Sequence, residues 1–228
     1  MEYQKLLKIS RARIKKGRGT RVKFDRERLH HFCIFMVGTG LRVDEALQLE
    51  WEDIRCIDRE RVVNRQATET IVSAYGKDFL SQLERYYLQI NVGVSKSRPH
   101  TAYGTGSAYF AYQNLIKLYT SNPQFNCKVG EGTIFKLHSF REGLNSLLDE
   151  ADLKFEKLGD SRVKRDSKSF RHTFIQFMLN KGMSSTAIAK MCGTSTEMID
   201  KYYTSNMALD TMMDTFNKVK GGHLKIVS

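Results

Sequence analysis

The chain has 228 residues, of which 41% are hydrophobic and 11% aromatic, a composition typical of a globular protein and not of a disordered one. No stretch approaches the roughly eighteen apolar residues that a membrane span needs, and the first residues lack the apolar core of a signal peptide. We therefore expect a protein that folds and works inside a cell. The formal net charge of +12 favours a polyanionic partner, because cationic side chains release counterions when they neutralise phosphates.

Many of the basic residues fall into two clusters. A solvated surface is the alternative interpretation of either cluster alone, but two clusters and a large net excess favour nucleic acid. The first cluster comprises Arg11, Arg13, Lys15, Lys16, Arg18, Arg21 and Lys23, and the second comprises Arg162, Lys164, Arg165, Lys168 and Arg171.

The four cysteines are widely spaced and form no Cys-x-x-Cys pair, which predicts reduced thiols and neither a disulfide framework nor a zinc site. His30, His31 and Cys33 lie close together, but they belong to an apolar pattern of helical period with no second group of ligands nearby. We interpret them as part of a helix. No metal or other cofactor is predicted.

Apolar spacing and the positions of glycine and proline predict the elements of the chain in order. We expect helices at 2–14, 26–37, 44–51, 78–87, 107–120, 135–150, 169–181, 184–191, 195–203 and 208–219, and strands at 53–63 and 87–94, the second continuing into a hairpin.

This pattern predicts a fold that is mainly α with a small antiparallel β-sheet (α+β). No composition shift or linker suggests a domain boundary after residue 24. We therefore expect a single domain over residues 1–228, with a basic N-terminal helix and linker at 1–24 and a C-terminal tail helix within 204–228.

Three segments, in this order, together resemble the catalytic domain of the tyrosine recombinases, the phage integrase family. They are TGLRVDEALQLEWEDI at 39–54, SFRHTF at 169–174 and GTSTEMIDKYY at 193–203. The resemblance covers nearly the whole chain. It implies the DNA breaking-rejoining enzyme fold and an activity that cleaves and rejoins double-stranded DNA without ATP.

The resemblance assigns Arg42 and Arg171 to the two arginine positions of the family and Tyr203 to the nucleophile. Two permanently charged, forked guanidiniums suit the charge that builds on the non-bridging phosphate oxygens during displacement. A tyrosine phenol conserves the bond energy as a phosphotyrosine that a second hydroxyl can attack. The rival nucleophile is the adjacent Tyr202, which we expect to point to the opposite side of the helix or into the core.

The leaving 5′ oxygen needs a proton, which a lysine on a β-hairpin supplies in the family. GVSKSRPH at 93–100 resembles that hairpin, so Lys96 is the candidate. The interval from Arg42 to Lys96 is longer than the compact form of the family, with an apparent insertion at 60–86. Lys77 is therefore the alternative.

The chain departs from the family at two positions where histidine is common. Lys168 stands three residues before Arg171, where it can contact a phosphate but is a general base only if it is buried. Thr194 follows Gly193, and with Glu197 it also matches a capping box, so a cap and a phosphate contact are both open. Glu45 matches an acidic family position that orients its neighbours. The base that deprotonates Tyr203 is left open.

By resemblance, the protein is a site-specific recombinase of a mobile element that acts on the DNA of the cytoplasm or nucleoid. Its tail would support self-association into a tetramer on paired sites, or else pack on its own core. Two alternatives stay open, a type IB topoisomerase or telomere resolvase, and a catalytically silent DNA-binding regulator. The family also implies an additional N-terminal DNA-binding domain, so we expect the chain to be an excised fragment or a minimal form.

Overall fold

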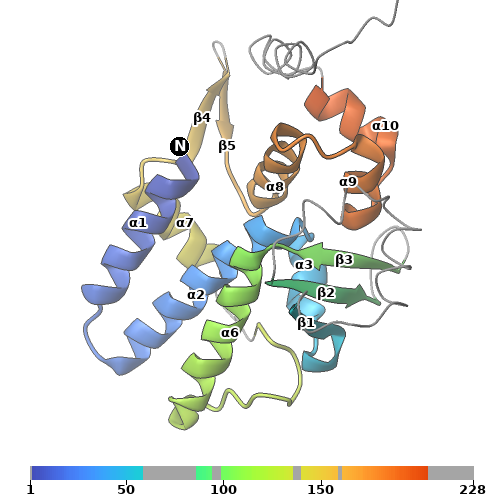
Figure 1. The fold of residues 1–228 in the computed structure, drawn as a ribbon. Coiled ribbons are helices and arrows are strands. Elements are labelled where there is room, and N and C mark those ends of the chain that lie inside the picture. The colour runs from blue at the N-terminus through green and yellow to red at the C-terminus, as the bar shows by residue number, and fades with distance from the viewer. Residues whose placement is uncertain (1, 59–85, 94–98, 136–139, 159–160, 205–228) are drawn as a thin grey trace, which may run out of the picture.

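A computed structural model describes residues 2–58, 86–93, 99–135, 140–158 and 161–204. Four helices form its larger part, with α2 (Thr20–Thr39) between α1 (Glu2–Lys15), α6 (Gly106–Thr120) and α7 (Phe140–Glu150) (Figure 1). A sheet and a second group of helices complete it. The fold is mainly helical with a small antiparallel sheet, as the sequence predicts.

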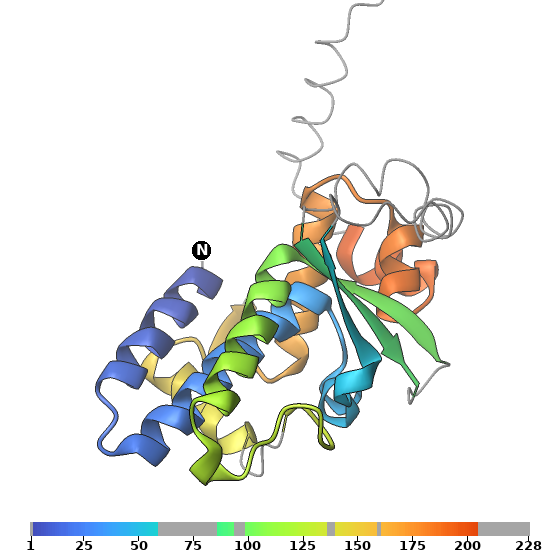
Figure 2. The same ribbon diagram turned by 60° about the horizontal axis from the view of Figure 1, so that its bottom comes forward.

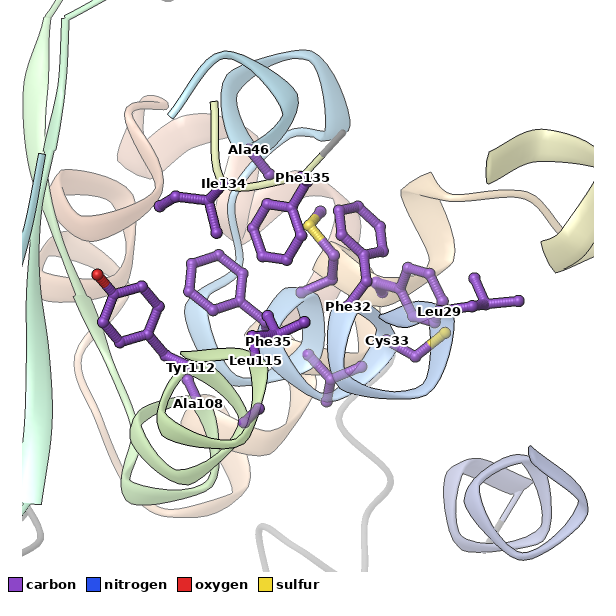
Figure 3. Close-up of a cluster of buried hydrophobic side chains, with 14 of the residues drawn as sticks. Leu29, Phe32, Cys33, Phe35, Ala46, Ala108, Tyr112, Leu115, Ile134 and Phe135 are labelled. Carbon is purple, nitrogen blue, oxygen red and sulfur yellow. The ribbon is translucent and has the colours of Figure 1, made fainter. Parts of the chain in front are cut away.

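α2 is the central helix of the first core. Its buried side chains lie on all sides of the helix, which is the pattern of a helix surrounded by other elements. Phe32 and Phe35 are fully buried and pack edgewise or tilted on Phe135, with ring centroids 4.8 and 5.0 Å apart. Figure 3 shows this cluster, in which Leu115 and Tyr112 of α6 approach the same rings.

The three-stranded sheet is formed by β1 (Ile54–Asp58), β2 (Tyr86–Val92) and β3 (His100–Gly104), in that order and antiparallel throughout. Side chains along a strand alternate between two faces. Leu88 and Ile90 of β2 face the first core, whereas Tyr87 faces a second core. The sheet thus contributes side chains to both cores.

The second core holds the helices of the last third of the chain. These are α8 (Lys168–Asn180), α9 (Ser185–Cys192) and α10 (Thr196–Ile199), followed by the π-helical turn η3 (Asp200–Thr204). Phe174, Ile188 and Cys192 are among the side chains that this core buries completely or nearly so. Figure 2 shows these helices grouped at one end of the sheet, away from α1 and the loop that follows it.

Several boundaries differ from the predicted ones. Residues 20–24, predicted as linker, are the first turn of α2, because Phe24 is buried against the rings of Tyr119 and Phe125 and anchors that turn. Tyr86, predicted to lie in a helix, opens strand β2, one residue before the predicted start of that strand at Tyr87. Residue 135, predicted to start a helix, precedes α7, which begins at Phe140.

A hairpin of β4 (Phe155–Leu158) and β5 (Ser161–Lys164) was not predicted. Phe155 and Val163 on this hairpin are exposed, so the sequence carries no alternation between a buried and a solvent face. The remaining short elements are α3 (Val43–Gln48) and two 3₁₀ turns, η1 (Trp51–Asp53) and η2 (Pro123–Phe125). None of the described helices is both long enough and apolar enough to cross a bilayer.

Candidate active site

The turn between α2 and α3 is set by Gly40. Its φ of +67° lies in the left-handed region, and its N–H closes α2 by bonding to the carbonyl of Met36 at 3.0 Å. A Cβ at this position would lie 2.2 Å from Cδ1 of Phe174 on α8. Only glycine therefore lets the end of α2 approach α8 this closely.

Arg42 follows this turn at the N-cap of α3. Glu45, which is 3% exposed, accepts hydrogen bonds from the Arg42 backbone N–H at 2.8 Å and from Nη1 at 2.6 Å. Nη2 of Arg42 donates to the backbone carbonyl of Gly193 at 3.2 Å. The arginine is thus held between its own helix and the segment that leads to Tyr203, and Glu45 is what holds it.

Arg171 lies on the first turn of α8. Its Nη1 donates to the carbonyl of Gly40 at 3.1 Å. Within the part of the chain that the structure describes, this is the one hydrogen bond of its side chain. Its other guanidinium N–H groups have no hydrogen-bond partner among the described residues.

The nucleophile segment begins where α9 ends. Gly193 adopts a φ of +58°, and the N–H of Thr194 bonds to the carbonyl of Ala189 at 2.9 Å, which closes the helix. The predicted cap at Thr194 is wrong. The N-cap of α10 is Ser195, whose hydroxyl accepts from the N–H of Met198 at 3.3 Å, because Thr194 is used in closing α9.

Tyr202 and Tyr203 lie together in η3. Ile199, just before this turn, is 1% exposed and fixes the segment to the second core, against which Tyr203 is partly buried. Tyr202 is 53% exposed. Of the two alternatives predicted for Tyr202, burial in the core is therefore wrong. Both tyrosines line one groove, and only Tyr203 packs against the second core.

The hydroxyl of Tyr203 is hydrogen-bonded to Nδ1 of His172, and the two ring centroids lie 5.4 Å apart. His172 was not among the site residues predicted from the sequence. Its position directly after Arg171 was the one available signal. Burial raises the pKa of Tyr203 to about 12, although the charge of Arg171 opposes the rise. Burial and the charge of Arg171 lower the pKa of His172, so its neutral form is favoured.

One groove of about 1120 Å³ between α3, α7, α8 and η3 is lined by Arg42, Arg171, His172, Tyr202 and Tyr203. Lys168 lies on its wall with an exposed side chain, which suits a cation that contacts phosphate better than a general base. Thr194 lies on the wall as well. Arg141 had not been identified from the sequence. The cationic side chains of the groove are Arg42, Arg141, Lys164, Lys168 and Arg171, against the two carboxylates of Asp44 and Asp166.

Not all members of the two basic clusters face this groove. Arg13 pairs with Glu150 at 3.2 Å and joins α1 to α7, and Arg165 pairs with Glu2 at 2.8 Å. The loop at 16–19 lies at the opposite end from α8 and α10 in both views (Figures 1 and 2). In the first cluster, only Arg13 is partly buried, and the other six residues are exposed around α1, the loop and the start of α2. Lys164, Lys168 and Arg171 of the second cluster line the groove.

Lys96 and Lys77 both lie outside the described residues. The strands on either side of residues 94–98 pair as a hairpin, with Val92 opposite His100. β3 packs against α9, and a Cβ added to the C-cap residue Gly193 would lie 2.6 Å from Cε1 of His100. Within the described ranges, no group of three or more His, Cys, Asp or Glu side chains is arranged to hold a metal ion, and all four cysteines are free.

A comparison with protein families matches residues 2–208 to the model of the phage integrase family. The chain belongs to the phage integrase family. A comparison with curated proteins gave no match. The identification rests on a match over most of the chain, and it agrees with the three segments that carried the resemblance in the sequence.

Solved structures share this phage integrase fold. XerH recombinase bound to a palindromic difH substrate is 16% identical with a TM-score of 0.59, over 95% of this chain and 52% of that one. XerA recombinase is 14% identical with a TM-score of 0.57, over 95% and 61%. The Tn1549 transposon integrase in complex with transposon right end DNA is 16% identical with a TM-score of 0.53, over 95% and 63%. The chain thus spans between half and two thirds of each of these chains.

Proposed function

We propose that this chain is the catalytic part of a site-specific DNA recombinase, an integrase that cleaves and rejoins double-stranded DNA through a 3′-phosphotyrosine at Tyr203. The observation that carries the proposal is the groove itself. Arg42 and Arg171, 129 positions apart in the sequence (171 − 42), line it together with the hydroxyl-bearing Tyr203.

The proposed reaction is an in-line displacement at phosphorus. The oxygen of Tyr203 forms a bond to the phosphorus of the scissile phosphate, and the bond from phosphorus to the 5′ oxygen breaks. The tyrosine proton leaves to a base, and the 5′ oxygen takes a proton from Lys96. Attack by a 5′ hydroxyl then reverses these steps on the same or another strand, so no external energy source is needed.

The two arginines are assigned to the non-bridging oxygens. Both are held by backbone carbonyls of glycine turns, Arg42 by Gly193 and Arg171 by Gly40, so their guanidiniums are in place before substrate binds. Donors fixed in advance stabilise the developing charge without reorganisation. Lys168 and Thr194 would contact the same phosphate or its neighbours.

DNA is the proposed partner on three grounds. The net charge is +12, the groove is lined mainly by cations, and XerH and the Tn1549 integrase, which share the fold, were solved with DNA. Self-association into a tetramer on paired sites stays a prediction, because the tail from residue 205 lies outside the described residues. The family match supports a recombinase over a topoisomerase or a silent regulator.

Covalent capture tests the proposal without knowledge of the target sequence. The protein is incubated with a pool of nicked DNA duplexes of random sequence, and complexes that resist SDS are recovered and sequenced. We expect the wild-type chain to enrich a defined site and Tyr203→Phe to yield no covalent complex while still retarding DNA in a native gel. Equal capture by wild-type and Tyr203→Phe chains would contradict the proposal, as would DNA binding without any capture across the pool.

A further inference from the structure

The environment of the Tyr203 hydroxyl bears on the base that the sequence left open. His172 lies on the first turn of α8, and Tyr203 lies in η3, where the second core holds it. Within the described part of the chain, Nδ1 of His172 is the one hydrogen-bonding partner of the Tyr203 hydroxyl. The contact joins an imidazole directly to the oxygen that the proposed reaction uses.

The charges around His172 favour an imidazole that accepts the hydrogen bond. Burial lowers the pKa of His172, Arg171 and Lys168 lower it further, and Asp166 opposes them. Tyr203 holds its proton firmly, with a pKa raised to about 12. The phenol is therefore the donor and neutral Nδ1 the acceptor near neutral pH, which requires the remaining imidazole proton to sit on Nε2.

Lys168 is the other candidate, since it stands where the family commonly has histidine. It lines the same groove, but its side chain is exposed, and its backbone N–H bonds to Asp166 at 2.8 Å. The structure gives it no bond to Tyr203 within the described residues. A lysine ammonium has no lone pair with which to accept a proton, so geometry and charge both favour Lys168 as one of the phosphate-binding cations.

We propose that His172 is the general base that activates Tyr203, an inference that rests on the proposed function. As the Tyr203 oxygen bonds to phosphorus, its proton passes to Nδ1 of His172, and the bond from phosphorus to the 5′ oxygen breaks with protonation of that oxygen by Lys96. The imidazolium formed lies beside Arg171, which favours return of the proton when the phosphotyrosine is attacked and the phenol leaves.

The tautomer of His172 tests the premise without DNA. Long-range ¹H–¹⁵N spectra of the ¹⁵N-labelled protein at pH 7.5, assigned with His172→Gln, report which ring nitrogen carries the proton (the pH is about one unit above the usual value for histidine). We expect a protonated Nε2 and an unprotonated Nδ1 whose shift changes in Tyr203→Phe but not in Tyr202→Phe. A protonated Nδ1 would overturn the inference, even if the chain proves to be a recombinase.

The rate of covalent capture on the selected site tests the role itself. His172→Asn retains an acceptor near the position of Nδ1 but cannot take up a proton. We expect a loss of roughly 100- to 10,000-fold, the range for a general base, and loss of the rise in rate with pH that the wild type shows up to the pKa of His172. A variant that only disturbed positioning would keep that pH profile.

Added imidazole provides the rescue experiment. It should restore capture in His172→Ala, whose truncated side chain leaves room for the ring, and leave Lys168→Ala and Tyr203→Phe unrescued. If Lys168→Ala loses the pH-dependent rise while His172→Asn keeps it, Lys168 is the base and the inference is wrong. Capture that does not depend on Tyr203 would instead reject the proposed function, and the tautomer measurement would still decide whether His172 can accept the proton.

Discussion

Nη2 of Arg42 donates to the backbone carbonyl of Gly193 at 3.2 Å, although 151 positions separate the two residues in the sequence. Through this bond the first arginine segment is tied to the segment that carries Tyr203. Arg171 makes the reciprocal connection, because its Nη1 bonds to Gly40 in the turn just before Arg42. Arg42 thus holds the segment that leads to Tyr203, and Arg171 holds the turn that leads to Arg42.

A substrate with a 5′-bridging sulfur distinguishes the proposed role of the arginines from that of the proposed acid. A 5′-bridging sulfur gives a leaving group that needs no proton, whereas charge on the non-bridging oxygens must be stabilised whatever atom leaves. Arg171→Lys should cut covalent capture on the order of 100-fold or more on both substrates. Lys96→Ala should lower the rate of covalent capture about 100- to 10,000-fold on the ordinary substrate, and the sulfur substrate should restore that rate.

The same assay includes Lys77→Ala as the matched control. If the sulfur substrate rescues Lys77→Ala and not Lys96→Ala, the apparent insertion at 60–86 has displaced the acid, and Lys77 takes that role. If neither variant is rescued, the acid lies elsewhere in the protein.

Gly40 provides a test of how the site is built. Gly40→Ala adds left-handed strain of about 1–2 kcal/mol and a methyl group within 2.2 Å of the Phe174 ring, which costs about 1–3 kcal/mol more. Gly182 has a φ of +82° with nothing within 4 Å of an added Cβ, so Gly182→Ala carries the strain alone. Urea unfolding should give Gly40→Ala a clearly lower free energy of unfolding than Gly182→Ala. Equal stabilities would mean that the α2–α8 approach is not close.

Acid should destabilise the first core through its buried histidines. Burial lowers the pKa of His31 to about 4, so the unfolded chain binds more protons between the ordinary value of 6.5 and 4. Stability is therefore lost as pH falls through that window. Between about pH 7 and pH 5, the free energy of unfolding of the wild type should fall by on the order of 1–2 kcal/mol more than that of His31→Leu, as measured by urea unfolding. Parallel losses in the two proteins would show that His31 is not buried in its neutral form.

Local patterns predicted much of the fold and the sequence positions of the proposed site. The helix at 107–120 and the stop at Gly40 follow from short-range rules, apolar period and glycine after a helix, that tertiary contacts did not override. The hairpin of β4 and β5 was not predicted, because neither Phe155 nor Val163 is buried. Strands that are held by backbone pairing at the surface, and not by burial, leave no hydrophobic pattern in the sequence.

The role of His172 could not have been predicted in the same way. Its contact with Tyr203 spans 31 positions and depends on how α8 and η3 pack in the second core, which no local spacing encodes. The Arg165–Glu2 pair, 163 positions apart, is a second case, in which a residue assigned to a DNA-binding cluster is used to fasten the N-terminal helix. Long-range pairing decides which basic residues are left to face a ligand.

Peptide mapping of the captured complex shows which tyrosine carries the phosphate. Digestion with trypsin and nuclease leaves a nucleotide on one tyrosine of the peptide at 202–218, and fragmentation mass spectrometry distinguishes the two neighbours. We expect the modification on Tyr203, with capture abolished in Tyr203→Phe and retained in Tyr202→Phe. A nucleotide on Tyr202, or capture that survives Tyr203→Phe, would contradict it.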